Sequence, residues 1–343
     1  MQEEVKAFKV KLLPESEVEL SGDIPFESLA PYRNQALTDL AARLDMPGFL
    51  KGHVPTDIAA KQFGEIPILE EACELYLKEF YPLLVTHHTI EAVGRPEIRI
   101  IKLAPGNPVS VIIKTAVYPK VELPKQWQKL AADVPVSESA PATEEEIAQT
   151  LKSLQESRKQ KTPEGTETLP ELDDAFAQSL GAFTTLDALK AEIARGITEE
   201  KQRAARDSRR GAILDRLVEQ AHVTVPRIFV ESEIDKIMAQ MNEDLARMQL
   251  SLPVYLTHVK KTEAELRNDF KAQAEKRAKV QLILNAIAEA EHITADPEAV
   301  EREVQIAKEH FPKANEELVR IHVETVLRND RVLQLLESDT KKE

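Results

Sequence analysis

The residue types best suited to binding chemistry lie together in one short stretch. Residues 46–55 read Met-Pro-Gly-Phe-Leu-Lys-Gly-His-Val-Pro and hold two of the chain's ten glycines. Proline fixes φ near each end of this stretch, and glycine permits positive φ within it. Phe49 and Lys51 would then form an apolar and a cationic tip. We interpret the stretch as a shaped loop that contacts another molecule; the alternative is a helix-helix connection whose Phe49 turns back into the core.

Patterns for catalysis or metal binding are lacking elsewhere. The eight histidines are scattered, and the adjacent pair His87-His88 cannot reproduce the i, i+4 spacing of a helical metal site. The sequence has no phosphate-binding glycine loop and no Ser/His/Asp order. Cys73, the single cysteine, lies on an apolar helical stripe, which favours a buried thiol over a nucleophile. We therefore predict no catalytic residue, no metal and no cofactor, and expect a protein that is not an enzyme.

Composition and charge narrow the class of protein. The chain has 343 residues and a formal net charge of -14, so it is long enough for two or three domains, and its bulk charge repels DNA. The N-terminus is acidic where a signal peptide would be basic, and no run of about 18 apolar residues occurs. We expect a cytoplasmic protein without a membrane partner. Charged residues at 30% and aromatic residues at 5% favour long solvent-exposed helices and an extended, mainly helical chain.

The elements around the glycine loop predict an α+β domain over residues 1–118. Apolar and charged residues alternate over 8–20, as in two strands with one exposed face. Helical spacing follows from Pro25 to Leu44, leads into the loop, and resumes in a short helix over 55–63 and a longer one that Pro82 should end or kink. Two further strands are expected over 98–117.

Beyond residue 168 the pattern is helical and repeats itself. A long helix is expected from Leu186 to Gln220; its arginines at 203, 206, 209 and 210 form either an ion-paired solvated face or a contact for RNA or clients. At an offset of seventy, His222-Val223-Thr224 matches His292-Ile293-Thr294, and Val230-Glu231 matches Val300-Glu301. We interpret this as two copies of a unit in which one helix ends at the turn and another starts after a proline.

Two apolar features of the first copy could bind a flexible partner. A methionine-rich stripe recurs at steps of three and four, and methionine repacks readily around different ligands. An ordinary seam between helices is the alternative. An apolar hairpin tip is expected next, at residues 250–256, before a helix that opens with a Thr262/Glu265 capping box. The candidate client-binding residues are Ile234, Met238, Met241, Leu245, Met248, Leu252, Val254, Tyr255 and Leu256.

The loop carries a resemblance to a known family. Gly48-Phe49-Leu50-Lys51-Gly52-His53-Val54-Pro55 resembles the Gly-Phe-Arg-x-Gly-Lys-x-Pro signature of trigger factor, the bacterial ribosome-associated chaperone. The family's arginine is Leu50 here and its second basic residue is His53, so Lys51 is the one permanent cation left in the signature. Each lost cation removes a phosphate-type contact, which predicts weaker affinity for ribosomal RNA and protein.

Two further stretches resemble the borders of the family's domains. Residues 119–124 resemble the exit from its first domain, and residues 168–172 resemble the entry into its helical one. Most members insert a prolyl-isomerase domain between these borders, whereas about 45 residues separate them here, below the usual domain range. A helix capped by Thr143 is expected in this segment. Trp127 is its single aromatic residue, so an aromatic proline pocket is not expected.

The resemblance implies an α+β ribosome-binding domain (1–118), a linker with a short helix (119–168) and an elongated, all-α, two-armed chaperone domain (169–343). It implies an ATP-independent chaperone that lacks isomerase activity, docks on the large ribosomal subunit near the exit tunnel through residues 48–55, and shields nascent or unfolded chains. It also implies links to protein folding, protein transport and cell division, and possible homodimers. The alternative is a ribosome-free holdase or assembly factor, which the Leu50 and His53 departures would favour.

Overall fold

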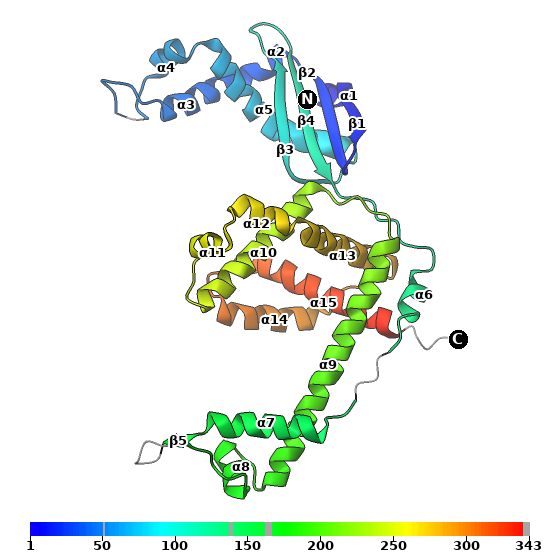
Figure 1. Cartoon of the computed structure of the whole chain (residues 1–343). Coiled ribbons are helices and arrows are strands. Elements are labelled where there is room, and N and C mark those ends of the chain that lie inside the picture. Colours follow the sequence, from blue (N-terminus) through cyan, green and yellow to red (C-terminus); the bar gives the residue numbers. More distant parts are fainter. Residues whose placement is uncertain (51, 137–139, 162–166, 339–343) are drawn as a thin grey trace. The chain divides into compact units, whose positions relative to one another are not determined.

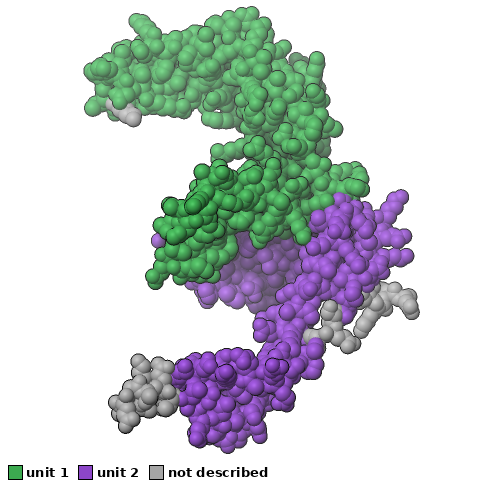
Figure 2. Space-filling view, in the orientation of Figure 1, with its two compact units in different colours: residues 1–122, 222–282 green, residues 123–221, 283–343 purple. Residues whose placement is uncertain are grey.

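A computed structural model describes residues 1–50, 52–136, 140–161 and 167–338 of the chain (Figure 1). These residues divide into two compact units, coloured separately in Figure 2. One unit joins residues 1–122 to 222–282, and the other joins 123–221 to 283–343. Each unit thus combines stretches that are distant in the sequence, and the division falls inside the helical region. The three consecutive domains 1–118, 119–168 and 169–343 remain a prediction.

The N-terminal residues form a four-stranded antiparallel sheet, as the α+β prediction requires. Its spatial order is β1-β2-β4-β3, so the last two strands lie beside the first two in reverse order. Both strand pairs contain the residues whose alternation predicted them, but β3 begins at Ala92, six residues before the expected start at residue 98. The elements are α1 (Gln2–Ala7), β1 (Lys9–Leu13), β2 (Glu17–Ile24), β3 (Ala92–Lys102) and β4 (Val109–Val117).

One long helix, α5 (Glu65–His87), supplies the other half of this core. Tyr76 and Phe80 from the helix are fully buried and stack with ring centroids 5.1 Å apart. They share one cluster with Leu20 and Ile113 of the sheet. Burial of this kind dominates the stability of a small α+β domain. Cys73 lies in the same cluster, and its burial raises the pKa of the thiol to about 12, as expected of an unreactive cysteine.

Two prolines of this region affect its helices in different ways. The helix expected from Pro25 to Leu44 is three pieces, α2 (Phe26–Leu29), the 3₁₀ turn η1 (Ala30–Tyr32) and α3 (Arg33–Arg43). Pro31 lacks the N–H that would continue the α-helical hydrogen-bond ladder. Pro82, by contrast, does not end α5, which continues to His87. Leu84 is fully buried just beyond it, so burial in the core outweighs the lost hydrogen bond.

The segment from 119 to 185 is folded over its described residues. It contains α6 (Trp127–Ala132), α7 (Glu144–Ser157), the two-residue strands β5 (Gln160–Lys161) and β6 (Glu167–Thr168), and α8 (Asp174–Leu180). The predicted cap is confirmed: Thr143 Oγ1 accepts from the Glu146 amide at 3.3 Å, and the Thr143 amide donates to Glu146 Oε2 at 2.8 Å. Leu151 of α7 and Phe176 of α8 pack on Leu189, so the three helices share one small core.

The rest of the chain is helical, which confirms the predicted fold class of a small α+β region followed by an all-helical one. The stretch 250–256, expected as a hairpin tip, instead begins a helix; Ser251 precedes that helix and Pro253 lies in its first turn, where proline is tolerated. The helices are α9 (Leu186–Gln220), α10 (Arg227–Arg247), α11 (Leu252–Val259), α12 (Glu263–Asp269), α13 (Lys271–Ala290), α14 (Pro297–His310) and α15 (Glu316–Ser338). Among the described residues, none of these helices is long and apolar enough to span a membrane.

The internal repeat is visible in the structure. One helix ends before His222 and another before His292, and in both copies a new helix follows within five residues. The matched residues Glu231 and Glu301 also make the same kind of contact, because each accepts a hydrogen bond from an arginine. Glu231 accepts from Arg267 Nη2 at 3.3 Å, and Glu301 accepts from Arg320 Nη2 at 2.8 Å. In each copy, therefore, the first turns of the second helix are tied by an ion pair to a helix that follows later in the sequence.

Two arginines of the α9 cluster are paired within the chain, and a contact of the cluster with RNA or clients stays a prediction. Arg210 donates to Glu337 Oε1 at 2.8 Å and to Asp330 Oδ1 at 3.1 Å, and Arg209 donates to the carbonyls of Val134 and Glu337. These two arginines serve the packing of α9 against α15 and the segment after α6. Arg203 and Arg206 are exposed.

Candidate functional site

The glycine loop connects α3 to α4 (Thr56–Phe63), and both of its ends are anchored by apolar contacts. Val54 is 5% exposed and packs in a cluster with Ala41 of α3 and Ala59 of α4. Met46, half-buried, packs on the same cluster from the other end of the loop. Apolar contacts at both ends thus hold the loop on the helices, while the described residues between Met46 and Val54 lie outside the core.

Backbone geometry shapes the loop as the glycine pattern predicts. The Phe49 amide donates to the Met46 carbonyl at 3.1 Å, and the His53 amide donates to the Leu50 carbonyl at 2.9 Å, so two turns follow one another. Gly48 has φ +95° and Gly52 has φ +82°, a region that other residues rarely adopt. A Cβ at Gly52 would also stand 3.3 Å from the Ala42 carbonyl oxygen. Both glycines are therefore required by the conformation of the loop.

The tip of the loop is apolar and exposed. Phe49 is 38% exposed and Leu50 is 78% exposed, so Phe49 does not turn back into the core as the alternative proposed. His53 and Pro55 are exposed as well. Lys51, the predicted cation of the site, lies outside the described residues. The role of residues 48–55 in ribosome binding stays a prediction.

Two ion pairs brace the helix that leads into the loop. Arg33 donates to both carboxylate oxygens of Glu65, at 3.1 and 2.9 Å, and this hydrogen-bonded guanidinium lowers the pKa of Glu65. Arg43, the last residue of α3, binds both oxygens of Glu71 at 3.2 and 3.0 Å. Paired arginine-carboxylate contacts of this kind fix orientation. Arg43, the cation nearest to the start of the loop, is thus paired with a carboxylate of α5.

The methionine stripe is largely a seam between helices. Ile234, Met238 and Leu245 are buried, and Ile234 and Met238 share a cluster with Leu266 of α12. Partly buried members complete this cluster from α10 and α11: Met241, Leu252, Tyr255 and Leu256. The seam alternative therefore describes these residues in this structure. Met248 and Val254 are the exceptions, because they are 70% and 46% exposed.

Met248 and Val254 belong to a small exposed apolar group at the turn between α10 and α11, together with Leu250. Sequence reasoning missed a second group of this kind around the turn between α14 and α15. There the large apolar side chains of Ile306, Phe311, Leu318 and Ile321 are exposed. The signal for it was Phe311-Pro312, an aromatic residue at a helix stop, with Leu318 and Ile321 one turn apart on the next helix. Exposed apolar groups at helix turns are typical of surfaces that bind other chains.

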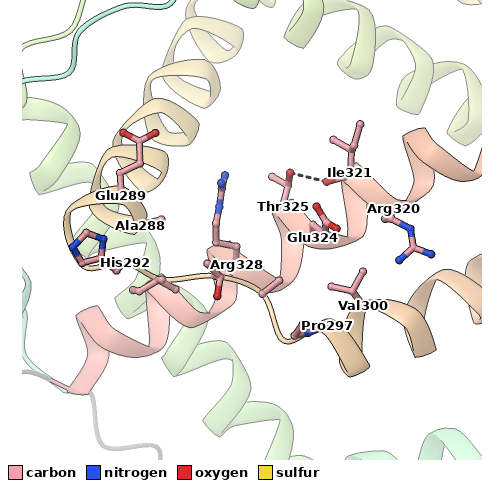
Figure 3. A pocket seen from close by; sticks show the side chains of 13 residues that line it. Ala288, Glu289, His292, Pro297, Val300, Arg320, Ile321, Glu324, Thr325 and Arg328 are labelled. Atoms are coloured by element: carbon pink, nitrogen blue, oxygen red, sulfur yellow. Dashed lines mark hydrogen bonds between the residues drawn. The ribbon is translucent and has the colours of Figure 1, made fainter.

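A cleft of about 800 Å³ lies between the end of α13, the turn 292–295, α14 and α15 (Figure 3). Arg328 reaches from α15 toward α13, where its Nη2 donates to Asn285 Oδ1 at 2.5 Å. Its buried Nε has no hydrogen-bond partner among the described residues. A second cleft, of about 880 Å³, occupies the matching place in the first copy of the repeat, beside the turn 223–225. The repeat thus yields one cleft per copy.

Comparisons with known proteins match the N-terminal and the helical regions of the chain to one family. Sequence models described as "Bacterial trigger factor protein (TF)" and "Bacterial trigger factor protein (TF) C-terminus" match residues 6–154 and 185–343. Among curated relatives, "Trigger factor" of Shouchella clausii is 27% identical over 373 aligned positions, covering 83% of this chain and 85% of its own. "Trigger factor" of Carboxydothermus hydrogenoformans is 24% identical, covering 90% of this chain and 92% of its own.

A solved structure also has a similar fold. It is described as "Promiscuous Substrate Recognition in Folding and Assembly Activities of the Trigger Factor Chaperone". The match has a TM-score of 0.53 at 17% identity and covers 96% of this chain and all of the other. The alignment to the Shouchella relative is longer, at 373 positions, than the 343 residues of this chain, so it opens gaps in this chain.

Proposed function

The chain belongs to the trigger factor family, and from that premise we propose that it is a chaperone that docks on the ribosome and shields emerging chains without ATP. In this proposal the N-terminal α+β region contacts the large subunit near the exit tunnel. The helical region receives apolar segments of nascent or unfolded polypeptides. A cytoplasmic location follows from such a partner.

The observation that supports docking most directly is the exposed pair Phe49 and Leu50 on an anchored, glycine-shaped loop. Apolar side chains held at a tip lose little conformational freedom on binding, which favours affinity. Since the chain carries a net charge of -14, attraction to the ribosome has to be local. Lys51 would supply that local charge, while Leu50 replaces the ionic contact of the family's arginine with an apolar one.

A crosslinking experiment tests docking at the level of one residue. A photoreactive amino acid at Leu50 should crosslink to a component of the large subunit near the exit tunnel. The same group at Ile101, an exposed apolar position on β3, serves as the matched control and should give no such crosslink. Equal crosslinking from both positions, or none from Leu50, would contradict docking through this loop.

The proposed client surface is the exposed apolar group of Met248, Leu250 and Val254, not the whole predicted stripe. Weak apolar contacts that exchange quickly need no nucleotide, because several low-affinity sites add through multivalency. Suppression of the aggregation of a refolding protein, measured with and without ATP, tests this part. Equal suppression under both conditions is expected, and dependence on ATP would contradict it.

We further propose that the chain lacks isomerase activity. In the described residues of 119–168, the single tryptophan, Trp127, is buried, which leaves no open aromatic pocket for a proline ring in this segment. A proline-containing peptide should therefore isomerise at the rate of buffer alone, and a faster rate would overturn this part of the proposal.

The second candidate function is a ribosome-free holdase or assembly factor, and the loop residues Leu50 and His53 favour it, because neither carries the permanent charge of the family's signature. Self-association is a related possibility that sedimentation of the purified chain would measure.

A further inference from the structure

The first strand of the N-terminal sheet has an open edge. Among the described residues, β1 is hydrogen-bonded to β2 alone and forms one end of the sheet. Four of its five residues are exposed. A free strand edge presents unpaired backbone N–H and C=O groups that can pair with an added strand.

The outer face of the sheet carries a row of alternating charges that ends at this edge. Lys11 on β1 lies opposite Glu19 on β2, Glu19 lies opposite Lys114 on β4, and Lys114 lies opposite Glu97 on β3. Opposite charges in directly facing positions stabilise antiparallel pairs. Continuing this alternation beyond Lys11 requires an acidic residue on the next strand.

The other face carries an apolar row that ends at the same edge. Val10 lies opposite Leu20, Leu20 opposite Ile113, and Ile113 opposite Ile98. Leu20 and Ile113 are fully buried, whereas Val10 is 42% exposed and its neighbour Leu12 is 80% exposed. On this face, therefore, the buried side chains end at β2, and those of β1 are exposed. An apolar residue on an added strand would bury the side chains that β1 leaves in water.

The opposite edge of the sheet differs. β3 contains Pro96, which has no N–H to offer, and its register against β4 shifts between Val93 and Glu97 and again between Ile100 and Lys102. Proline and bulges of this kind block strand addition. β1 has neither device within Lys9–Leu13, so the two edges are not equivalent.

We propose that the β1 edge binds an extended peptide segment in which acidic and apolar residues alternate. The strand already paired with β1 shows part of the complement, because Val18, Glu19 and Leu20 lie opposite Leu12, Lys11 and Val10. Lys9 lies opposite Ser21, so a glutamate at that place on an added strand would pair the second lysine. A segment Glu-Val-Glu-Leu-Glu, added antiparallel in the same register, places Glu opposite Lys11 and Lys9, and apolar residues opposite Leu12 and Val10. This occupant differs from a second copy of the chain, since pairing β1 with itself brings lysines together.

A peptide titration tests the proposal on the full chain. The probe is a fluorescent peptide containing Glu-Val-Glu-Leu-Glu, with a Lys-Val-Lys-Leu-Lys peptide as its charge-reversed partner. The acidic peptide should bind and should protect the amides of residues 9–13 from hydrogen exchange. Lys11→Glu should weaken binding of the acidic peptide by about tenfold and strengthen binding of the basic peptide. Lys102→Glu, at the β3 edge, is the matched control and should change neither.

The remaining outcomes are decisive as well. Absence of binding by both peptides, with the fold retained, would mean that Lys9 and Lys11 only protect the edge against pairing, and the proposal would fail. Concentration-dependent dimers that protect residues 9–13 without peptide would also overturn it. Because the probe is a free peptide and its binding site excludes residues 48–55, a failure of ribosome docking leaves the result unaffected.

Discussion

Phe49 and Val54 lie five residues apart on the same loop, yet Val54 is buried among the helices and Phe49 faces solvent. This contrast separates the anchor of the loop from its contact surface. Gly48 and Gly52 make the change of direction possible, because both adopt positive φ. The loop is thus built to hold apolar side chains in water at a fixed place, an arrangement that costs solvation unless a partner covers them.

Substitutions at Val54 and Leu50 should separate stability from docking. Val54→Ala should lower the free energy of unfolding of the N-terminal region by about 2 kcal/mol, because it removes buried methyl groups and leaves a cavity. Leu50→Ala should change it by less than about 0.5 kcal/mol, since this side chain is exposed. Hydrogen exchange of the α5 amides in urea measures both. Equal losses would mean that Leu50 packs into the core in solution.

Two methionines of α10 offer a comparison within one residue type. Met238 is buried in the seam with α12, so Met238→Ala should destabilise the helical region by about 3 kcal/mol. Met248 is 70% exposed, so Met248→Ala should leave stability nearly unchanged and reduce aggregation suppression. Thermal unfolding and a refolding assay on both variants check this pair. Full suppression by Met248→Ala would exclude this side chain from the client surface.

The capping box of α7 should make its stability depend on acid. The hydrogen bond from Lys201 Nζ, at 2.7 Å, together with those from Thr143, lowers the pKa of Glu146 from 4.5 to about 2. Because the folded pKa lies below the unfolded value, this contribution is complete above pH 4.5 and is lost as the pH falls toward 2.

Exchange rates of the α7 amides across this range measure the effect. Wild type should show progressive loss of protection in α7 between the two values. Glu146→Gln should have weaker protection at neutral pH and a flatter pH profile. The same profile in both proteins would show that Glu146 does not hold the helix.

How far the sequence predicts this structure depends on how local the signal is. The strand pairs and the Thr143 cap follow from alternation and capping residues, which act within a few residues. Pro82 does not end the helix, one of the two outcomes that the local pattern left open, because the burial of Leu84 in the sheet core is a long-range contact. The stripe containing Met238 had two possible partners, and only tertiary packing decided between them. The cleft beside Arg328 joins helices whose approach no local pattern encodes.

The sequence also placed the loop, its glycines and the exposed Phe49 correctly, because glycine and proline act on the backbone directly. Lys51, the other residue of the predicted tip, lies outside the described residues. The sequence did not reveal that Val54 is an anchor while Phe49, Leu50, His53 and Pro55 are exposed. A signature motif reads as one unit in sequence, and only the structure divides it into residues that pack and residues that point outward.

The most direct test of the central claim is co-sedimentation with ribosomes from the protein's own source, at about 50 mM and about 200 mM salt. Phe49→Ser/Leu50→Ser should bind about tenfold or more weakly than wild type at both salts, because both exposed contacts are removed. Lys51→Ala should remove most of the salt dependence, and Ile66→Ser, an exposed apolar control on α5, should bind like wild type. Pelleting of the double variant equal to wild type would contradict docking through this loop.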